Sequence, residues 1–87
     1  MTIRQQIRQF IVGEFLFGQK DSLQDDTSLL DAGVLDSMGV LQTLFHLEET
    51  FGIQVEDDEV MPENIDSINN LTDFVTRKLS QAEAQPG

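Results

Sequence analysis

Apolar residues recur every three or four positions near the start of this 87-residue chain, with Arg and Gln on the opposite side. That spacing is typical of an amphipathic helix and predicts one over residues 3–17. Thr2 can cap its start, and Gly18 suits the left-handed turn that ends a helix. The apolar positions are Ile3, Ile7, Phe10, Ile11 and Phe15.

A second helical pattern covers residues 37–51, where Asp36-Ser37 can cap the start and Gly52 can end the helix. Its apolar stripe consists of Val40, Leu41, Leu44, Leu47 and Phe51. Met38 and Phe45 fall away from the centre of that stripe. Large apolar side chains there are typical of a contact surface, although Phe45 could equally be buried.

The last third of the chain predicts short turns followed by one more helix. A turn over residues 57–61 is limited by Pro62, and residues 62–65 can form another. Ser67 can then cap a helix that ends near residue 80. Its apolar positions are Ile68, Leu71, Phe74 or Val75, and Leu79. The polar segment 81–87 is expected to be a flexible C-terminal tail.

The segment 18–36 has no helical period and is long for a connection. Its five apolar residues predict a loop that packs on the helices. The sequence thus predicts an all-α fold, a small four-helix bundle with a long first loop and a short third helix, in a single domain over residues 1–80. The expected core residues include Ile7, Phe10, Leu44, Leu47, Phe51, Leu71 and Val75.

The charge of the chain is strongly negative, with a formal net charge of −11. The run from Asp21 to Thr76 holds 14 of the 16 acids and no Lys or Arg. This opposes nucleic-acid binding and favours either a solvated face or a surface that attracts basic partners. No apolar run approaches the roughly 20 residues of a membrane span, and no cysteine is present. We expect an unexported, cytoplasmic monomer.

No set of side chains forms a self-contained active site or metal site, so we expect neither an enzyme nor a metal. His46 is the only histidine, and its neighbours one helical turn away include no nucleophile that it would activate, so an exposed helix histidine is expected. A calcium loop starting at Asp21 fails because its twelfth position is Ala32 instead of Glu.

Asp36-Ser37 stands out because a long loop delivers it to the start of a helix. An ordinary helix cap is one interpretation. A phosphate attached to Ser37 would lie at the positive end of the helix dipole, which suits a modified serine better than a catalytic one.

The segment Leu30-Asp31-Ala32-Gly33-Val34-Leu35-Asp36-Ser37-Met38 resembles the attachment motif of the acyl carrier protein family, and the predicted architecture agrees over about residues 2–80. The resemblance implies that Ser37, beside Asp36, carries 4′-phosphopantetheine from coenzyme A. The thiol of that group would hold an acyl or aminoacyl cargo as a thioester. It also implies partner contacts on the second helix, at Met38, Val40, Phe45, Glu48 and Glu49. The expected partners are a phosphopantetheinyl transferase, a loading ligase and downstream transferases with basic docking surfaces.

The sequence departs from carriers of fatty-acid synthesis after the serine, because Gly39 and Gln42 replace two acids of that type. This favours a specialised carrier, and the form of the motif resembles stand-alone carriers of amino acids, including D-alanyl carriers. A cofactor-free acidic module for protein interaction is the alternative from another class.

Overall fold

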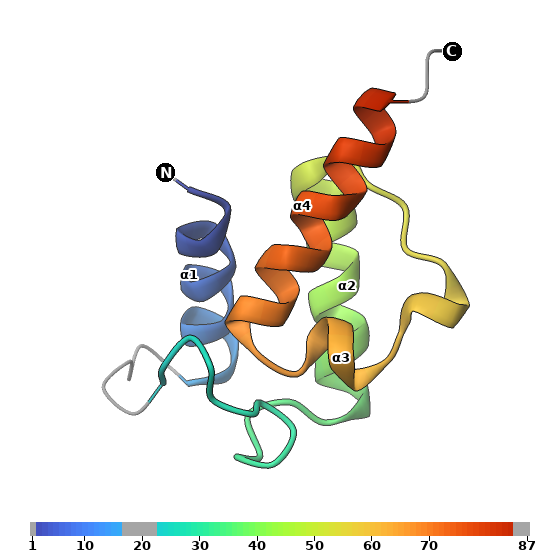
Figure 1. The fold of residues 1–87 in the computed structure, drawn as a ribbon. Helices are drawn as coiled ribbons and strands as arrows, with labels where there is room; N and C mark the ends of the chain where they lie inside the picture. The colour runs from blue at the N-terminus through green and yellow to red at the C-terminus, as the bar shows by residue number, and fades with distance from the viewer. Residues whose placement is uncertain (1, 17–22, 85–87) are drawn as a thin grey trace.

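A computed structural model of the chain describes residues 2–16 and 23–84, and Figure 1 shows these residues as a bundle of helices. The elements are α1 (Ile3–Phe15), α2 (Ser37–Phe51), the 3-10 turn η1 (Asp57–Glu59), α3 (Pro62–Ile65) and α4 (Ile68–Ala84). No strand occurs within the described ranges. The predicted all-α class, the long first loop and the short third helix are confirmed.

Local side-chain hydrogen bonds explain where the helices begin. The Thr2 hydroxyl accepts from the backbone N–H of Gln5 at 3.1 Å, and the Gln5 side chain accepts from the N–H of Thr2 at 2.9 Å, which is a capping box. Ser67 accepts from the N–H of Asn70 at 3.0 Å at the start of α4. Gly52 ends α2 with a φ of 67°, a left-handed conformation that glycine adopts without strain.

Two helix ends differ from the prediction. α1 ends at Phe15 rather than at residue 17, and Gly18 lies outside the described residues. α4 continues to Ala84, four residues past the predicted end. Residues 81–84 are Gln, Ala, Glu and Ala, which are strong helix formers, so the polar composition does not stop the helix.

The core lies between α4 and the three other helices, with α4 against α1, α3 and α2. Its fully buried apolar side chains come from α1, α2, α4 and the loop: Ile7, Ile11, Leu29, Leu47, Ile68, Leu71, Phe74 and Val75. The predicted core residues Phe10 and Phe51 are only half-buried, because they lie at the edge of the bundle. The loop is packed as predicted, since Leu23, Leu29 and Leu35 are buried.

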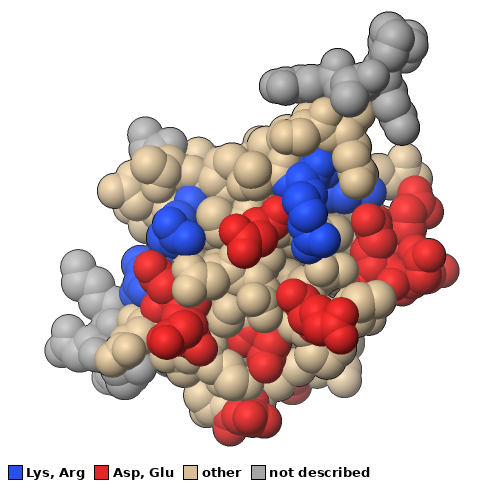
Figure 2. Space-filling model, in the orientation of Figure 1, with Lys and Arg blue, Asp and Glu red and all other residues tan. Residues whose placement is uncertain are grey.

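Charges are unevenly spread over the bundle. In the view of Figure 2, Lys and Arg side chains lie over α1 and α4, whereas Asp and Glu side chains gather on the first loop and around η1. No helix within residues 2–16 and 23–84 is long and apolar enough to cross a membrane.

Candidate functional site

Ser37 is the first residue of α2, and its side chain is exposed. The preceding Asp36 has an extended backbone and caps the helix, because its carboxylate accepts from the N–H of Gly39 at 2.7 Å. The carbonyl oxygen of Asp36 accepts the first helical bond, from the N–H of Val40 at 2.9 Å. Leu35, one residue earlier, is buried and anchors the approach. These contacts fix the backbone on both sides of an accessible hydroxyl group.

Gly39 lies in close packing at this helix start. A Cβ at this position would lie 3.1 Å from Cε1 of Phe15 and 3.3 Å from both the Asp36 carboxylate and Cδ2 of Leu35. Gly39 is buried at this helix start, so its contribution to the local charge is the absence of an acid, and its small size also suits the close approach of Phe15 from α1. Gln42 is exposed, so an uncharged residue at this position makes the surface less negative.

The loop before Ser37 is tied to the junction between α3 and α4 through Asp66. Its carboxylate accepts from the Ser28 hydroxyl at 2.7 Å and from the N–H of Leu30 at 2.9 Å. Its carbonyl oxygen accepts from the N–H of Leu29 at 2.6 Å. The carbonyl of Leu29 in turn accepts from the N–H groups of Val34 and Leu35, at 2.9 and 3.1 Å. A continuous set of bonds therefore leads from Asp66 almost to Ser37.

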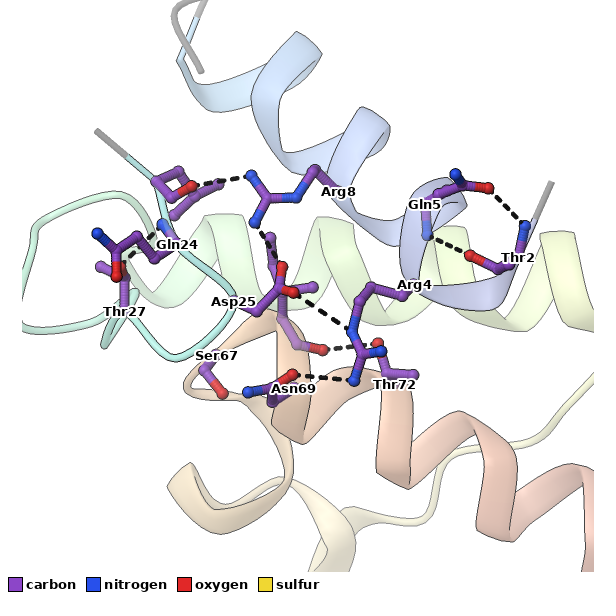
Figure 3. Close-up of polar contacts among 12 residues, drawn as sticks. Thr2, Arg4, Gln5, Arg8, Gln24, Asp25, Thr27, Ser67, Asn69 and Thr72 are labelled. Atoms are coloured by element: carbon purple, nitrogen blue, oxygen red, sulfur yellow. Dashed lines mark hydrogen bonds and ion pairs between the residues drawn. The ribbon is translucent and has the colours of Figure 1, made fainter. Parts of the chain in front are cut away.

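A second polar cluster holds the earlier part of the loop, as Figure 3 shows. Arg4 and Arg8 point from α1 toward the Asp25 carboxylate and form ion pairs with it. Arg8 also donates to the carbonyl of Leu23 at 2.8 Å, and Arg4 donates to the side chain of Asn69 in α4 at 3.0 Å. Neither Asp25 nor Asp66 was predicted from the sequence to be a positioning residue. The basic residues on the polar side of the first helix could have indicated an acidic partner such as Asp25.

An open groove of about 540 Å³ lies beside Ser37. Its walls are mainly apolar and come from the loop, from α2 and from the residue after η1: Leu30, Asp36, Ser37, Val40, Leu41 and Val60. A flexible chain attached to the Ser37 hydroxyl therefore has a surface to lie against, and the exposed serine leaves the attachment point accessible.

The far wall of the groove is secured through η1. Lys78 of α4 donates to the Glu59 carboxylate at 2.9 Å, and this hydrogen bond holds the pKa of Glu59 below its usual value. The same carboxylate accepts from the N–H of Glu56 at 2.9 Å. Val60 follows directly in the chain, so the contact between η1 and α4 determines where this wall of the groove lies.

The other residues that the sequence singled out on α2 divide into an exposed and an engaged group. Met38 and Phe45 are 66% and 64% exposed, and Glu49 is exposed as well. Val40 is buried below the groove. The Glu48 carboxylate accepts from the N–H of Val55 at 2.9 Å, so it holds the link after α2.

Leu41 was expected on the core side of α2, and that prediction is wrong, because its side chain is 47% exposed. The buried stripe runs through Gly39, Val40, Thr43, Leu44 and Leu47. Leu41 lies about 100° around the helix from Val40, beyond the edge of that stripe.

His46 is half-buried instead of exposed. Its ring stacks on Phe10 of α1 with centroids 3.9 Å apart, and its Nε2 lies 3.3 Å from the hydroxyl of Thr50. His46 lies nine positions after Ser37, which is about 13 Å along a helix, so it does not contact the serine. In residues 2–16 and 23–84, no three acidic or histidine side chains gather where they could hold a metal ion.

Comparisons with known proteins agree with this geometry. The family described as "phosphopantetheine attachment site" matches residues 5–75. The D-alanyl carrier protein of Streptococcus sanguinis is 33% identical over 76 residues, which are 87% of this chain and 94% of that protein. The D-alanyl carrier protein of Streptococcus suis is 37% identical over 71 residues, 82% of this chain and 87% of that protein.

The fold is similar to that of the holo acyl carrier protein from Nitrosomonas europaea, known from a solution structure. The TM-score is 0.74 and the identity is 34%, over 92% of this chain and 99% of that chain. The expected bundle architecture is confirmed by this likeness as well as by the helices themselves.

Proposed function

The chain belongs to the family of carrier proteins with a phosphopantetheine attachment site, and from this premise we propose that Ser37 is the residue that bears the group. The protein is a carrier that holds an acyl or aminoacyl group as a thioester on covalently bound 4′-phosphopantetheine. The family match therefore supports the carrier over the alternative of a cofactor-free interaction module. The exposure of the Ser37 hydroxyl at a capped helix start, beside an apolar groove, is the observation that carries the proposal.

The residues around Ser37 fit this group. When bound, the group supplies the thiol on which the cargo is held. In the attachment step the Ser37 oxygen attacks the pantetheine-bearing phosphorus of coenzyme A, and the phosphorus–oxygen bond to the nucleotide breaks. The serine proton passes to the transferase. A phosphodiester on Ser37 would be held at the N-terminus of the 15-residue α2, where the helix dipole favours an anion. Asp36 acts as a positioning residue by fixing the first turn.

We propose an aminoacyl cargo, with D-alanine as the first amino acid to test. Support comes from the D-alanyl carrier proteins among the relatives and from Gln42, which leaves the exposed part of early α2 without an acid. An acyl group of a specialised pathway is the second candidate, because the similar solved structure is an acyl carrier protein. The carrier itself needs no catalytic activity in either case.

The partner enzymes are proposed to dock on Met38, Leu41 and Phe45, which we call the exposed α2 face. These side chains lie within two helical turns of each other, and α2 carries no charged residue before Glu48. The flanking Glu49, with the acids around η1, favours a partner whose apolar patch has a basic rim. The transferase and the loading ligase are the proposed occupants. A cytoplasmic location and a monomeric state stay predictions.

Intact-mass measurement tests the attachment residue. The full chain is incubated with coenzyme A and a broad-specificity phosphopantetheinyl transferase. Wild type and Ser80→Ala, a control at an exposed serine of α4, are expected to gain one phosphopantetheinyl group, and Ser37→Ala none. No gain on wild type, or an equal gain on Ser37→Ala, contradicts the proposal.

The cargo is tested on the chain that carries phosphopantetheine. It is incubated with ATP and with ligases for D-alanine, L-alanine and fatty acids. A further mass gain with the D-alanine ligase supports the first candidate. A gain with only the fatty-acid ligase contradicts it and supports the second.

A further inference from the structure

Met38 has the most exposed of the large apolar side chains in the described part of the chain, at 66%. It directly follows Ser37 and occupies the second position of α2. Leu41 and Phe45, each about one helical turn further along, are 47% and 64% exposed. Met38 therefore lies at the serine end of the exposed α2 face, on which the partner enzymes are proposed to dock.

Methionine differs from the other residues of this face in having an oxidisable sulfur. Hydrogen peroxide transfers one oxygen atom to the thioether: a sulfur–oxygen bond forms, the oxygen–oxygen bond of the peroxide breaks, and water leaves. The sulfur loses two electrons to the peroxide. The sulfoxide is polar and chiral, and methionine sulfoxide reductases convert it back to the thioether.

Among the described residues, little competes with Met38 for this reaction. The chain has no cysteine, so before the prosthetic group is attached no thiol of the chain consumes the peroxide. Met61, at the N-terminal end of α3, is 37% exposed, against 66% for Met38. Because oxidation follows exposure of the sulfur, Met38 is expected to react before Met61.

We propose that Met38 is a reversible oxidation site whose sulfoxide slows the loading of Ser37. The reason is that a polar sulfoxide added to the exposed α2 face must be desolvated when an apolar partner surface covers it. The inference rests on the proposed function, because it concerns access to the same serine. It adds a response to peroxide that the carrier role alone does not require.

The test uses the full chain before loading, treated with hydrogen peroxide and compared with an untreated sample. Peptide mass spectrometry gives the oxidised fractions of Met38 and Met61, and intact mass gives the rate of phosphopantetheine attachment. We expect Met38 to oxidise first and the rate to fall in proportion to its oxidised fraction, reaching about a fivefold loss at full oxidation, as for loss of an interface contact worth about 1 kcal/mol. Methionine sulfoxide reductase should restore the rate.

Two variants distinguish the effect of oxidising Met38 from that of oxidising Met61. Peroxide should leave Met38→Leu at its own untreated rate, whereas Met61→Leu should lose rate as wild type does. Equal oxidation of both methionines, an unchanged rate with Met38 oxidised, or an equal rate loss in Met38→Leu overturns the inference. An untreated wild-type chain that is not loaded at all overturns the proposed function itself, which is a different result.

Discussion

The chain before Ser37 and the chain after it are built in opposite ways. Before the serine, hydrogen bonds and ion pairs hold the loop to distant elements. Asp66, between α3 and α4, binds the loop at Ser28 and Leu30, and Asp25 of the loop pairs with Arg8 of α1. After the serine, α2 presents Met38, Leu41 and Phe45 to solvent. Ser37 thus lies between a loop that is held by hydrogen bonds and ion pairs and the exposed α2 face.

This difference indicates a division of tasks. Hydrogen bonds within the molecule stabilise one conformation of the loop. The groups that form them are already paired, so they are not available to bind a partner. Exposed apolar side chains contribute little to folding, because they stay in water, and they become favourable only when another molecule covers them. Substitutions on the loop side should therefore change stability, and those on the exposed α2 face should change the behaviour of partner enzymes.

The largest effect on the free energy of unfolding is expected from Asp66→Ala. The Ser28 hydroxyl and the Leu30 N–H lose their acceptor, the Asp66 carboxylate, and such a loss costs about 1–3 kcal/mol. Urea unfolding measures it. Asp31→Ala removes the same charge from an exposed loop position and should cost less than about 0.5 kcal/mol. Equal stability of the two variants would break the comparison.

A smaller effect, up to about 1 kcal/mol, is expected from Glu59→Gln at pH 7, because it removes the partly buried ion pair with Lys78. The pKa of Glu59 is lowered in the folded chain, so the pair contributes fully above the unfolded pKa of about 4.3. The contribution is lost as the pH falls through the lower, folded pKa. Urea unfolding between pH 7 and pH 3 should show the stability difference between wild type and variant shrink.

The control for that experiment is Glu49→Gln, which makes the same chemical change at an exposed position of α2. Its stability difference from wild type should be smaller at pH 7. A Glu59→Gln difference that stays constant, or grows as the pH falls, would contradict the role given to the ion pair.

The smallest effect on stability, within about 0.5 kcal/mol, is expected from Phe45→Ser on the exposed α2 face. The KM of the loading ligase for the carrier should nevertheless rise about fivefold or more, as for loss of a contact worth at least about 1 kcal/mol. Steady-state kinetics with carrier as the varied substrate measures this. Gln42→Ser, at an exposed polar position of the same helix, should leave the KM near the wild-type value. A marked loss of stability with unchanged KM would reverse the assignment of tasks.

The sequence was sufficient for most of the architecture because its signals are local. The capping side chains of Thr2, Asp36 and Ser67 accept from N–H groups three residues away. Thr2 and Ser67 were predicted as caps, and Asp36 was one of two candidates together with Ser37. The end of α4 was placed too early, because polar composition was taken as a stop although helix formers continue the pattern.

The site was predicted in part. Asp36-Ser37 at the start of a helix and the exposed Met38 followed from spacing alone. The burial of Leu41 and of His46 was predicted wrongly, because it depends on which other parts of the chain cover α2. Periodicity shows which residues share a side of a helix, but it does not show how wide the covered stripe is or which other helix covers it.

The order of helices, their caps and the delivery of Ser37 to the start of α2 were determined by the sequence itself, since hydrogen bonds and apolar periods within a few residues are sufficient for them. Only the tertiary structure decided which apolar side chains stay uncovered and how the loop is held. The bond from Ser28 to Asp66 spans 38 residues, and the stack of Phe10 on His46 joins two helices. Such pairs form when the whole chain packs, so no local pattern specifies them.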